Sequence, residues 1–98
     1  MSAIAKYGDR IWHVHLKDCD PIVARTSRAE EWDYHTAVSQ GVFCELGRGA
    51  VAFQGVCEAL AALHYGGWMV VEQDVLPGLG TPSLSATRNR EYLRRIGL

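Results

Sequence analysis

The chain alternates stretches that favour β-strands with stretches that favour helices, and this order limits its fold class more than any other feature. β-branched and aromatic residues predict strands over about 11–17, 42–46 and 68–73. Helical segments are expected between these strands and after the last one. Strands that alternate with helices pair in parallel and are joined by right-handed crossovers. The sequence therefore predicts an α/β fold with three parallel strands.

Residues that start and stop helices support this order. Apolar residues at helical spacing predict a helix from Phe53, which Gly66–Gly67 are expected to end. Thr81–Pro82 suit the first positions of a last helix, and Gly97 suits its end.

Weaker patterns fill the remaining segments. Residues 21–31 have a weak helical pattern, and residues 3–7 suit the end of an earlier helix. Segment 32–40 is expected to be a helix or an irregular loop, and segment 77–80, with one proline and two glycines, a loop.

Composition excludes several classes of protein. The chain has 98 residues, is 48% hydrophobic and carries a formal net charge of −1, which argues against disorder and against nucleic-acid binding. Its runs without charged residues, such as 59–71, are all shorter than the roughly 20 residues of a membrane span. The first ten residues contain no apolar signal core, and the three cysteines include no CxxC pair. We therefore expect one domain at most, with reduced cysteines, in a cytoplasmic protein that contacts neither membrane nor nucleic acid.

The first predicted strand carries polar side chains on one face. Strand alternation places His13, His15 and Lys17 together, whereas the residues between them are apolar and suit a face that lies under helices. Polar groups on a buried strand need partners, which a metal, a substrate or a water-filled cavity would supply. Taken alone, the two histidines indicate hydrogen-bonded core residues or an exposed strand face rather than a ligand site. The three tryptophans, Trp12, Trp32 and Trp68, are expected to be packing residues rather than a platform for a sugar ring.

The third predicted strand ends in acidic residues. Glu72 follows an apolar run and shares its strand face with Asp74. Such a carboxylate can cap a helix or pair with an arginine, but a His and a Glu at the ends of neighbouring strands can also bind one divalent ion. Imidazole with carboxylate suits Mn²⁺, Co²⁺, Fe²⁺ or Zn²⁺, and Mg²⁺ less well.

A glycine-rich turn at 47–49 follows the second predicted strand. Its glycines permit a close approach of the backbone, and Arg48 could hold a substrate oxyanion or phosphate. A simple strand-to-helix turn is the alternative interpretation. Four arginines of the last helix are expected to form a solvated face: Arg88, Arg90, Arg94 and Arg95.

Three motifs, read in order, carry a resemblance. RIWHVHLKD, GVFCELGRGAVAF and HYGGWMVVEQD resemble the sugar-phosphate isomerase/epimerase superfamily of xylose isomerase-like TIM barrels, and most nearly its inosose dehydratase-like branch. The resemblance covers nearly the whole chain. It implies that residues 1–98 form the C-terminal part of an eight-stranded barrel, as strands six, seven and eight with their helices. Because a full barrel needs about 250 residues, we expect a fragment whose upstream units are missing.

The resemblance also implies a metal site and its neighbours. Family members bind one divalent ion through four side chains, of which His15 and Glu72 match two, whereas the two upstream ligands have no counterpart here. Mn²⁺ or Co²⁺ is expected, ahead of Zn²⁺, Fe²⁺ or Mg²⁺. His13 would line the pocket beneath the ion, and Lys17 and Asp18 would face the substrate.

One departure from the family pattern concerns a helix start. Ala52 replaces a common Asp just before the helix that begins near Phe53, and the loss of such a cap costs about 1 kcal/mol.

The implied activity is an isomerase, epimerase or dehydratase (lyase) reaction of sugar metabolism. A metal-bound keto-sugar or polyol would react through an enediolate, with Glu72 as the catalytic carboxylate and Arg48 among the substrate-binding groups. The 98-residue chain alone is expected to be inactive. The alternative is a non-catalytic fragment that folds only as a homo-oligomer or with the missing N-terminal part of the barrel.

Overall fold

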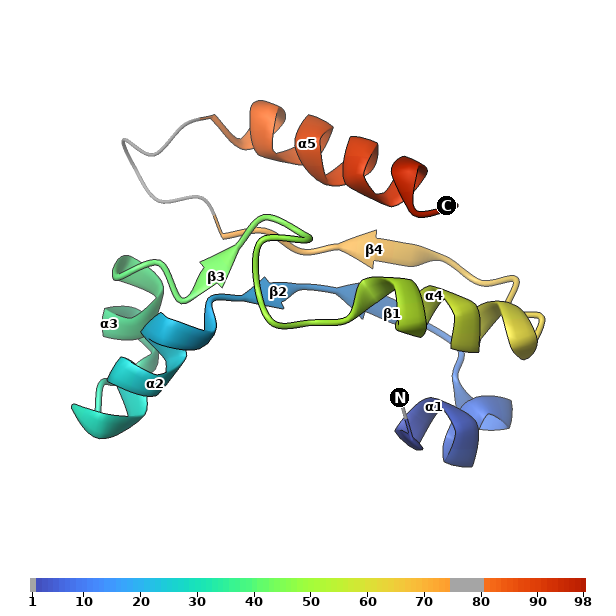
Figure 1. The fold of residues 1–98 in the computed structure, drawn as a ribbon, viewed down its shortest axis with the longest axis horizontal. Coiled ribbons are helices and arrows are strands. Elements are labelled where there is room, and N and C mark those ends of the chain that lie inside the picture. Colours follow the sequence, from blue (N-terminus) through green and yellow to red (C-terminus); the bar gives the residue numbers. More distant parts are fainter. Residues whose placement is uncertain (1, 75–80) are drawn as a thin grey trace.

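The computed structural model describes residues 2–74 and 81–98, so the expected loop at 77–80 lies outside the described residues. Helices and short strands alternate along the chain (Figure 1). In order, the elements are α1 (Ser2–Tyr7), η1 (Gly8–Arg10), β1 (Val14–Leu16), β2 (Asp18–Cys19), α2 (Pro21–Ala29), α3 (Tyr34–Ser39), β3 (Phe43–Cys44), α4 (Phe53–Ala62), β4 (Met69–Val71) and α5 (Pro82–Arg95).

The first and third predicted strands are parallel, as expected, but they pair directly, whereas the barrel order of strands six, seven and eight would place the second predicted strand between them. β1 and β4 are direct neighbours, with His15 opposite Val70 in the register. The amide of Glu72 continues this ladder by donating to the carbonyl of Leu16 at 2.9 Å. The chain is thus an α/β protein in which helices separate parallel strands.

The second predicted strand does not join this sheet. β3 pairs in antiparallel fashion with β2, and Asp18 lies opposite Cys44. The expected set of three parallel strands is therefore wrong at 42–46, because the described part of the chain places only β1 and β4 in the parallel sheet. The physical reason lies just after β3, where buried polar contacts described below turn the backbone toward β2.

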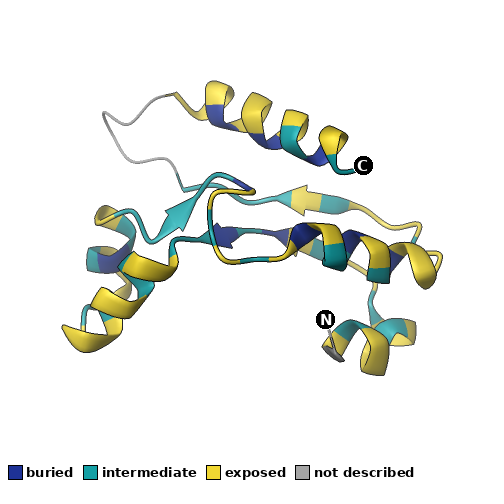
Figure 2. Ribbon diagram, in the orientation of Figure 1, coloured by how far each residue is buried: buried dark blue, intermediate teal, exposed yellow. Residues whose placement is uncertain are grey.

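Both long helices pack on one face of the parallel pair. The core contains Leu16 of β1, Phe53 of α4, Leu93 of α5 and Leu46, with Met69 of β4 packed against them. The buried positions of α5 lie on the side of the helix that faces β4 (Figure 2). The opposite face of β1 and β4, which carries His15 and Val70, is thus the face on which a site can form.

Most predicted helix boundaries are confirmed. Thr81 caps α5 by accepting the amide of Leu84, and Gly97, with φ +107°, follows its end. Ala52 precedes α4 without a side-chain cap, as expected from the sequence. The predicted stop at Gly66–Gly67 is too late, because His64 already takes a left-handed conformation with φ +54° after Leu63.

Two of the three tryptophans are exposed. Trp12 is 87% exposed and Trp68 is 81% exposed, so neither is the packing residue that the sequence indicated, whereas Trp32 is half-buried. Trp12 and Trp68 precede β1 and β4, and the Tyr65 hydroxyl donates to the Trp68 carbonyl at 2.6 Å. Among the described residues, no helix has the length and apolar character needed to cross a membrane.

Candidate metal and substrate site

His15 and Glu72 meet on the uncovered face of the parallel pair. His15 lies within β1 and Glu72 directly follows β4, and a hydrogen bond joins His15 Nδ1 to Glu72 Oε1. Their side chains are about half exposed. The hydrogen bond from His15 is the main reason why the pKa of Glu72 lies below its usual value. The predicted meeting of these two side chains is confirmed; their role in binding a metal stays a prediction.

Lys17 completes a small charged cluster beside them. Its ammonium lies 3.0 Å from Asp74 Oδ2 and 3.6 Å from Glu72 Oε2, and 3.9 Å from the centre of the Phe43 ring. Burial opposes the charged form of Lys17, but the hydrogen bond and charge of Asp74 outweigh it and raise the pKa of Lys17. Lys17 therefore stays a cation at the edge of the site. The shared strand parity of Glu72 and Asp74 pointed to this arrangement, whereas nothing in the sequence pointed to Phe43.

His13 lies next to His15. The two imidazole rings meet edge to face, with centroids 4.9 Å apart. The side chain of His13 is exposed.

The donor types of this cluster suit a borderline divalent ion. An imidazole nitrogen and a carboxylate oxygen already converge, and both donor types bind Mn²⁺, Co²⁺ or Zn²⁺. Within residues 2–74 and 81–98, no group of three or more His, Cys, Asp or Glu side chains is arranged to hold a metal ion. The pair therefore fits as part of a metal shell.

Asp18 does not face the uncovered side of the sheet. Its side chain is fully buried, and its carboxylate accepts four backbone amides, from Cys19 at 2.9 Å, Gly47 at 3.0 Å, Gly49 at 3.0 Å and Val51 at 3.1 Å. This placement corrects the expected substrate-facing role, because both oxygens are already engaged. Asp18 instead fixes the segment that follows β3 against the end of β2.

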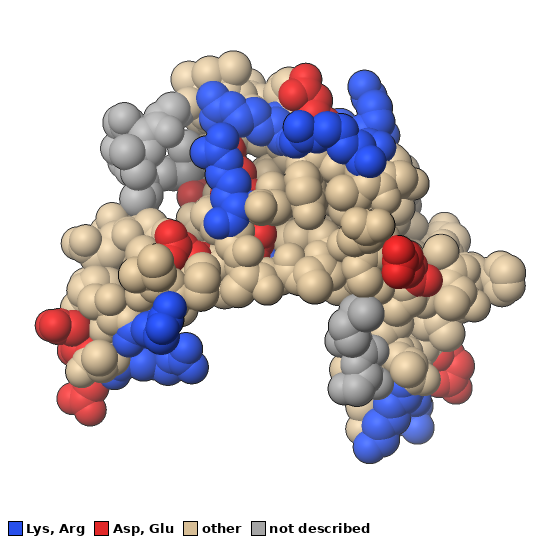
Figure 3. All heavy atoms as spheres, in the orientation of Figure 1, with Lys and Arg blue, Asp and Glu red and all other residues tan. Residues whose placement is uncertain are grey.

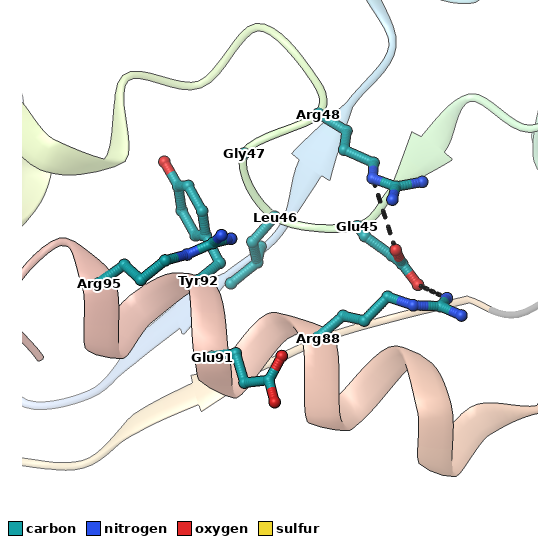
Figure 4. A pocket seen from close by; sticks show the side chains of 8 residues that line it. All are labelled: Glu45, Leu46, Gly47, Arg48, Arg88, Glu91, Tyr92 and Arg95. Carbon is teal, nitrogen blue, oxygen red and sulfur yellow. Dashed lines mark hydrogen bonds and ion pairs between the residues drawn. The ribbon is translucent and has the colours of Figure 1, made fainter.

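Arg48 lies on the other side of that segment. Its Nε is 3.6 Å from Glu45 Oε1, and it lines a pocket of about 290 Å³ together with residues of α5 (Figure 4). His15, Lys17 and Glu72 are not among the residues that line this pocket. The structure therefore does not bring Arg48, expected to bind substrate, into one pocket with His15 and Glu72.

Asn89 holds together the segments that follow β3 and β4, a role that the sequence did not reveal. It is almost fully buried on α5, its side-chain oxygen accepts the Leu46 amide at 2.8 Å, and its amide group donates to Gln73 at 3.1 Å. It thereby ties the segment after β3 to the segment after β4. A polar residue on a largely exposed helix gives no sequence signal for such a contact.

Curated proteins with similar sequences share one name. An inosose dehydratase of Geobacillus thermodenitrificans is 40% identical over 94 residues, which cover 96% of this chain and 32% of that protein. Inosose dehydratases of Klebsiella pneumoniae (37% over 94 residues, 96% of this chain and 31% of that protein) and Glaesserella parasuis (34% over 96 residues, 98% and 32%) are also similar. No family model and no solved structure matches the chain. The resemblance to the inosose dehydratase-like branch is confirmed, and the chain spans about a third of the length of the curated relatives that it matches.

Proposed function

We propose that this chain supplies part of the active site of a divalent-metal-dependent enzyme that acts on a sugar or polyol, as an inosose dehydratase does. The observation that carries the proposal is the meeting of His15 and Glu72 on the uncovered face of two neighbouring parallel strands. Sites in α/β proteins gather at the carboxyl ends of such strands. The similarity to proteins named inosose dehydratase favours a keto-polyol as the substrate.

His15 and Glu72 would hold the divalent ion. When bound, such an ion polarises a carbonyl and an adjacent hydroxyl, and so stabilises an enediolate. Because the described residues bring two such ligands together, the remaining ligands would come from another segment or from another chain.

The side chains of this chain then have separate tasks. Glu72 is kept ionised by His15 and Lys17, so that its carboxylate can bind the ion or accept a proton from the carbon beside a carbonyl. The Lys17 ammonium can donate to a substrate hydroxyl that leaves as water, and His13 can orient the polyol from beside His15. Neither Asp18 nor Arg48 takes part in this proposal.

Loss of His15 is expected to weaken Mn²⁺ binding by the chain at least about tenfold. Residues that only hydrogen-bond to a metal ligand contribute about tenfold or more to metal affinity, and a direct ligand should contribute at least as much. Electron paramagnetic resonance of free Mn²⁺ during a titration measures this affinity in the unaltered chain, in His15→Ala and in Glu72→Gln. His35→Ala, which removes an exposed imidazole on α3, is the matched control and should leave the affinity unchanged. Undetectable binding, or equal binding in His15→Ala, would contradict the assignment.

A second candidate is a non-catalytic chain that is stable only when associated. Within the described residues β1 and β4 each have one neighbour in their sheet, and unpaired strand edges favour association. Trp68 and Val70 expose apolar surface on the same face.

This second candidate predicts concentration-dependent oligomers in sedimentation velocity. Trp68→Lys should shift the distribution toward smaller species, because a charge on this face opposes its burial. Ile22→Lys, which changes an exposed apolar residue of α2, is the control and should not shift it. A compact monomer at all concentrations would rule out obligatory association.

A further inference from the structure

The pocket that Arg48 lines lies apart from the His15–Glu72 site, between the segment after β3 and helix α5. It has a volume of about 290 Å³ and is lined by the segment 45–48 together with four side chains of the helix (Figure 4). The helix contributes Arg88, Glu91, Tyr92 and Arg95. With Arg48 from the turn, three guanidinium groups from two separate elements line one small pocket.

One carboxylate in this pocket, that of Glu45, already has a positively charged partner. Glu45, whose side chain is 12% exposed, accepts hydrogen bonds from Arg88 at 2.8 Å and from Ser85 at 2.9 Å. Burial works against ionisation, but these two hydrogen bonds outweigh it and lower the pKa of Glu45. Arg88 donates to Glu45 and Arg48 lies 3.6 Å from it, and the three guanidinium groups outnumber the two carboxylates of the pocket, Glu45 and Glu91, by one positive charge.

The guanidinium groups are also accessible. The side chains of Arg48 and Arg88 are 69% and 49% exposed, and each guanidinium has more N–H donors than its contact with Glu45 uses. Basic side chains gather over α5 on the face shown in Figure 3. This gathering is local, since the whole chain has a formal net charge of −1.

The geometry points to a binding site for a small phosphate-bearing anion in this pocket, held by Arg48, Arg88 and Arg95. The planar fork of a guanidinium matches the oxygens of a phosphate, and charge-assisted hydrogen bonds of this kind are the strong ones. The pocket suits a small molecule rather than a long polyanion, since it is a concavity bounded by a turn and one helix. Glu91 on its rim opposes the ligand and limits the affinity.

The test is a titration of the chain with inorganic phosphate, without added metal, followed by isothermal calorimetry at constant ionic strength set with KCl. We expect saturable binding in the low-millimolar range. Arg95→Gln should weaken it about tenfold through the loss of a charged hydrogen bond, whereas Glu91→Gln should tighten it severalfold through the loss of a repelling charge. Among the described residues, neither side chain has a hydrogen bond or ion pair to lose, so both variants should keep the fold.

Arg94→Gln is the matched control, because Arg94 belongs to the same helix but does not line the pocket. Opposite shifts in Arg95→Gln and Glu91→Gln, with an unchanged Arg94→Gln, would establish the site. Absence of saturation, or equal weakening in Arg95→Gln and Arg94→Gln, would overturn it in favour of general attraction by a basic helix. Since no metal is present, this result does not depend on the fate of the His15–Glu72 proposal.

Discussion

Replacement of Asp18 by alanine is expected to lower the free energy of unfolding by on the order of 4 kcal/mol. The fully buried carboxylate accepts four backbone amides, and three of them belong to the segment 47–51. Each amide left buried without a partner costs about 1–3 kcal/mol, although water entering the gap would recover part of that loss. Since small domains are stable by only about 5–15 kcal/mol, this variant should be largely unfolded under mild denaturing conditions.

Urea denaturation followed by circular dichroism measures this loss. Asp18→Asn keeps one acceptor oxygen in place and should lose roughly half as much, about 2 kcal/mol. Asp9→Ala removes an exposed carboxylate from η1 and serves as the control, with a change within about 0.5 kcal/mol. A loss below about 1 kcal/mol in Asp18→Ala would show that the amides find other partners.

Gly49→Ala should be the second severe change, with a loss of about 2–3 kcal/mol. A Cβ at this position would lie 2.7 Å from the carbonyl carbon of Cys19 and would also collide with the Cys19 carbonyl oxygen and the Asp18 carboxylate. Two of these three atoms belong to the backbone, which cannot move aside without breaking the contacts of Asp18. The substitution is therefore strained even though the φ angle of Gly49 is not in the left-handed region.

Gly66→Ala is the matched control for this prediction. The same added methyl meets no atom within 4 Å at Gly66, so its stability should change by no more than about 0.5 kcal/mol. Thermal and urea denaturation of the two variants would compare them directly. Equal stabilities would mean that the segment after β3 adapts to the extra atom.

Both severe changes disturb the packing of segment 47–51 against Asp18, and the sequence did not reveal the importance of this contact. Two glycines around Arg48 predicted a tight turn, and the turn exists. The family resemblance instead implied that Asp18 faces the substrate, whereas in the structure it begins β2, two positions after the end of β1, and its side chain is buried. The partners of Asp18 are backbone amides, which every residue type except proline offers, so no side-chain pattern identifies them.

The meeting of His15 and Glu72 was easier to predict. His15 and Glu72 belong to the two predicted strands that are paired in parallel, and their positions relative to the strand ends determine that they meet. The charged neighbour Lys17 follows from the same alternation. The position of Arg48 did not follow, since it depends on how α5 packs against the turn.

The sequence by itself determined the order of helices and strands, the parallel direction of 14–16 and 69–71, the caps of α5 and the two polar positions that meet across the strands. These features depend on local periodicity and on strand alternation, which are properties of neighbouring residues. Only the tertiary structure decided the antiparallel pairing of β3, the burial of Asp18 and the arginine pocket at α5. Each of these depends on contacts between residues far apart in the chain, where a buried polar group takes whichever partner the packing brings to it.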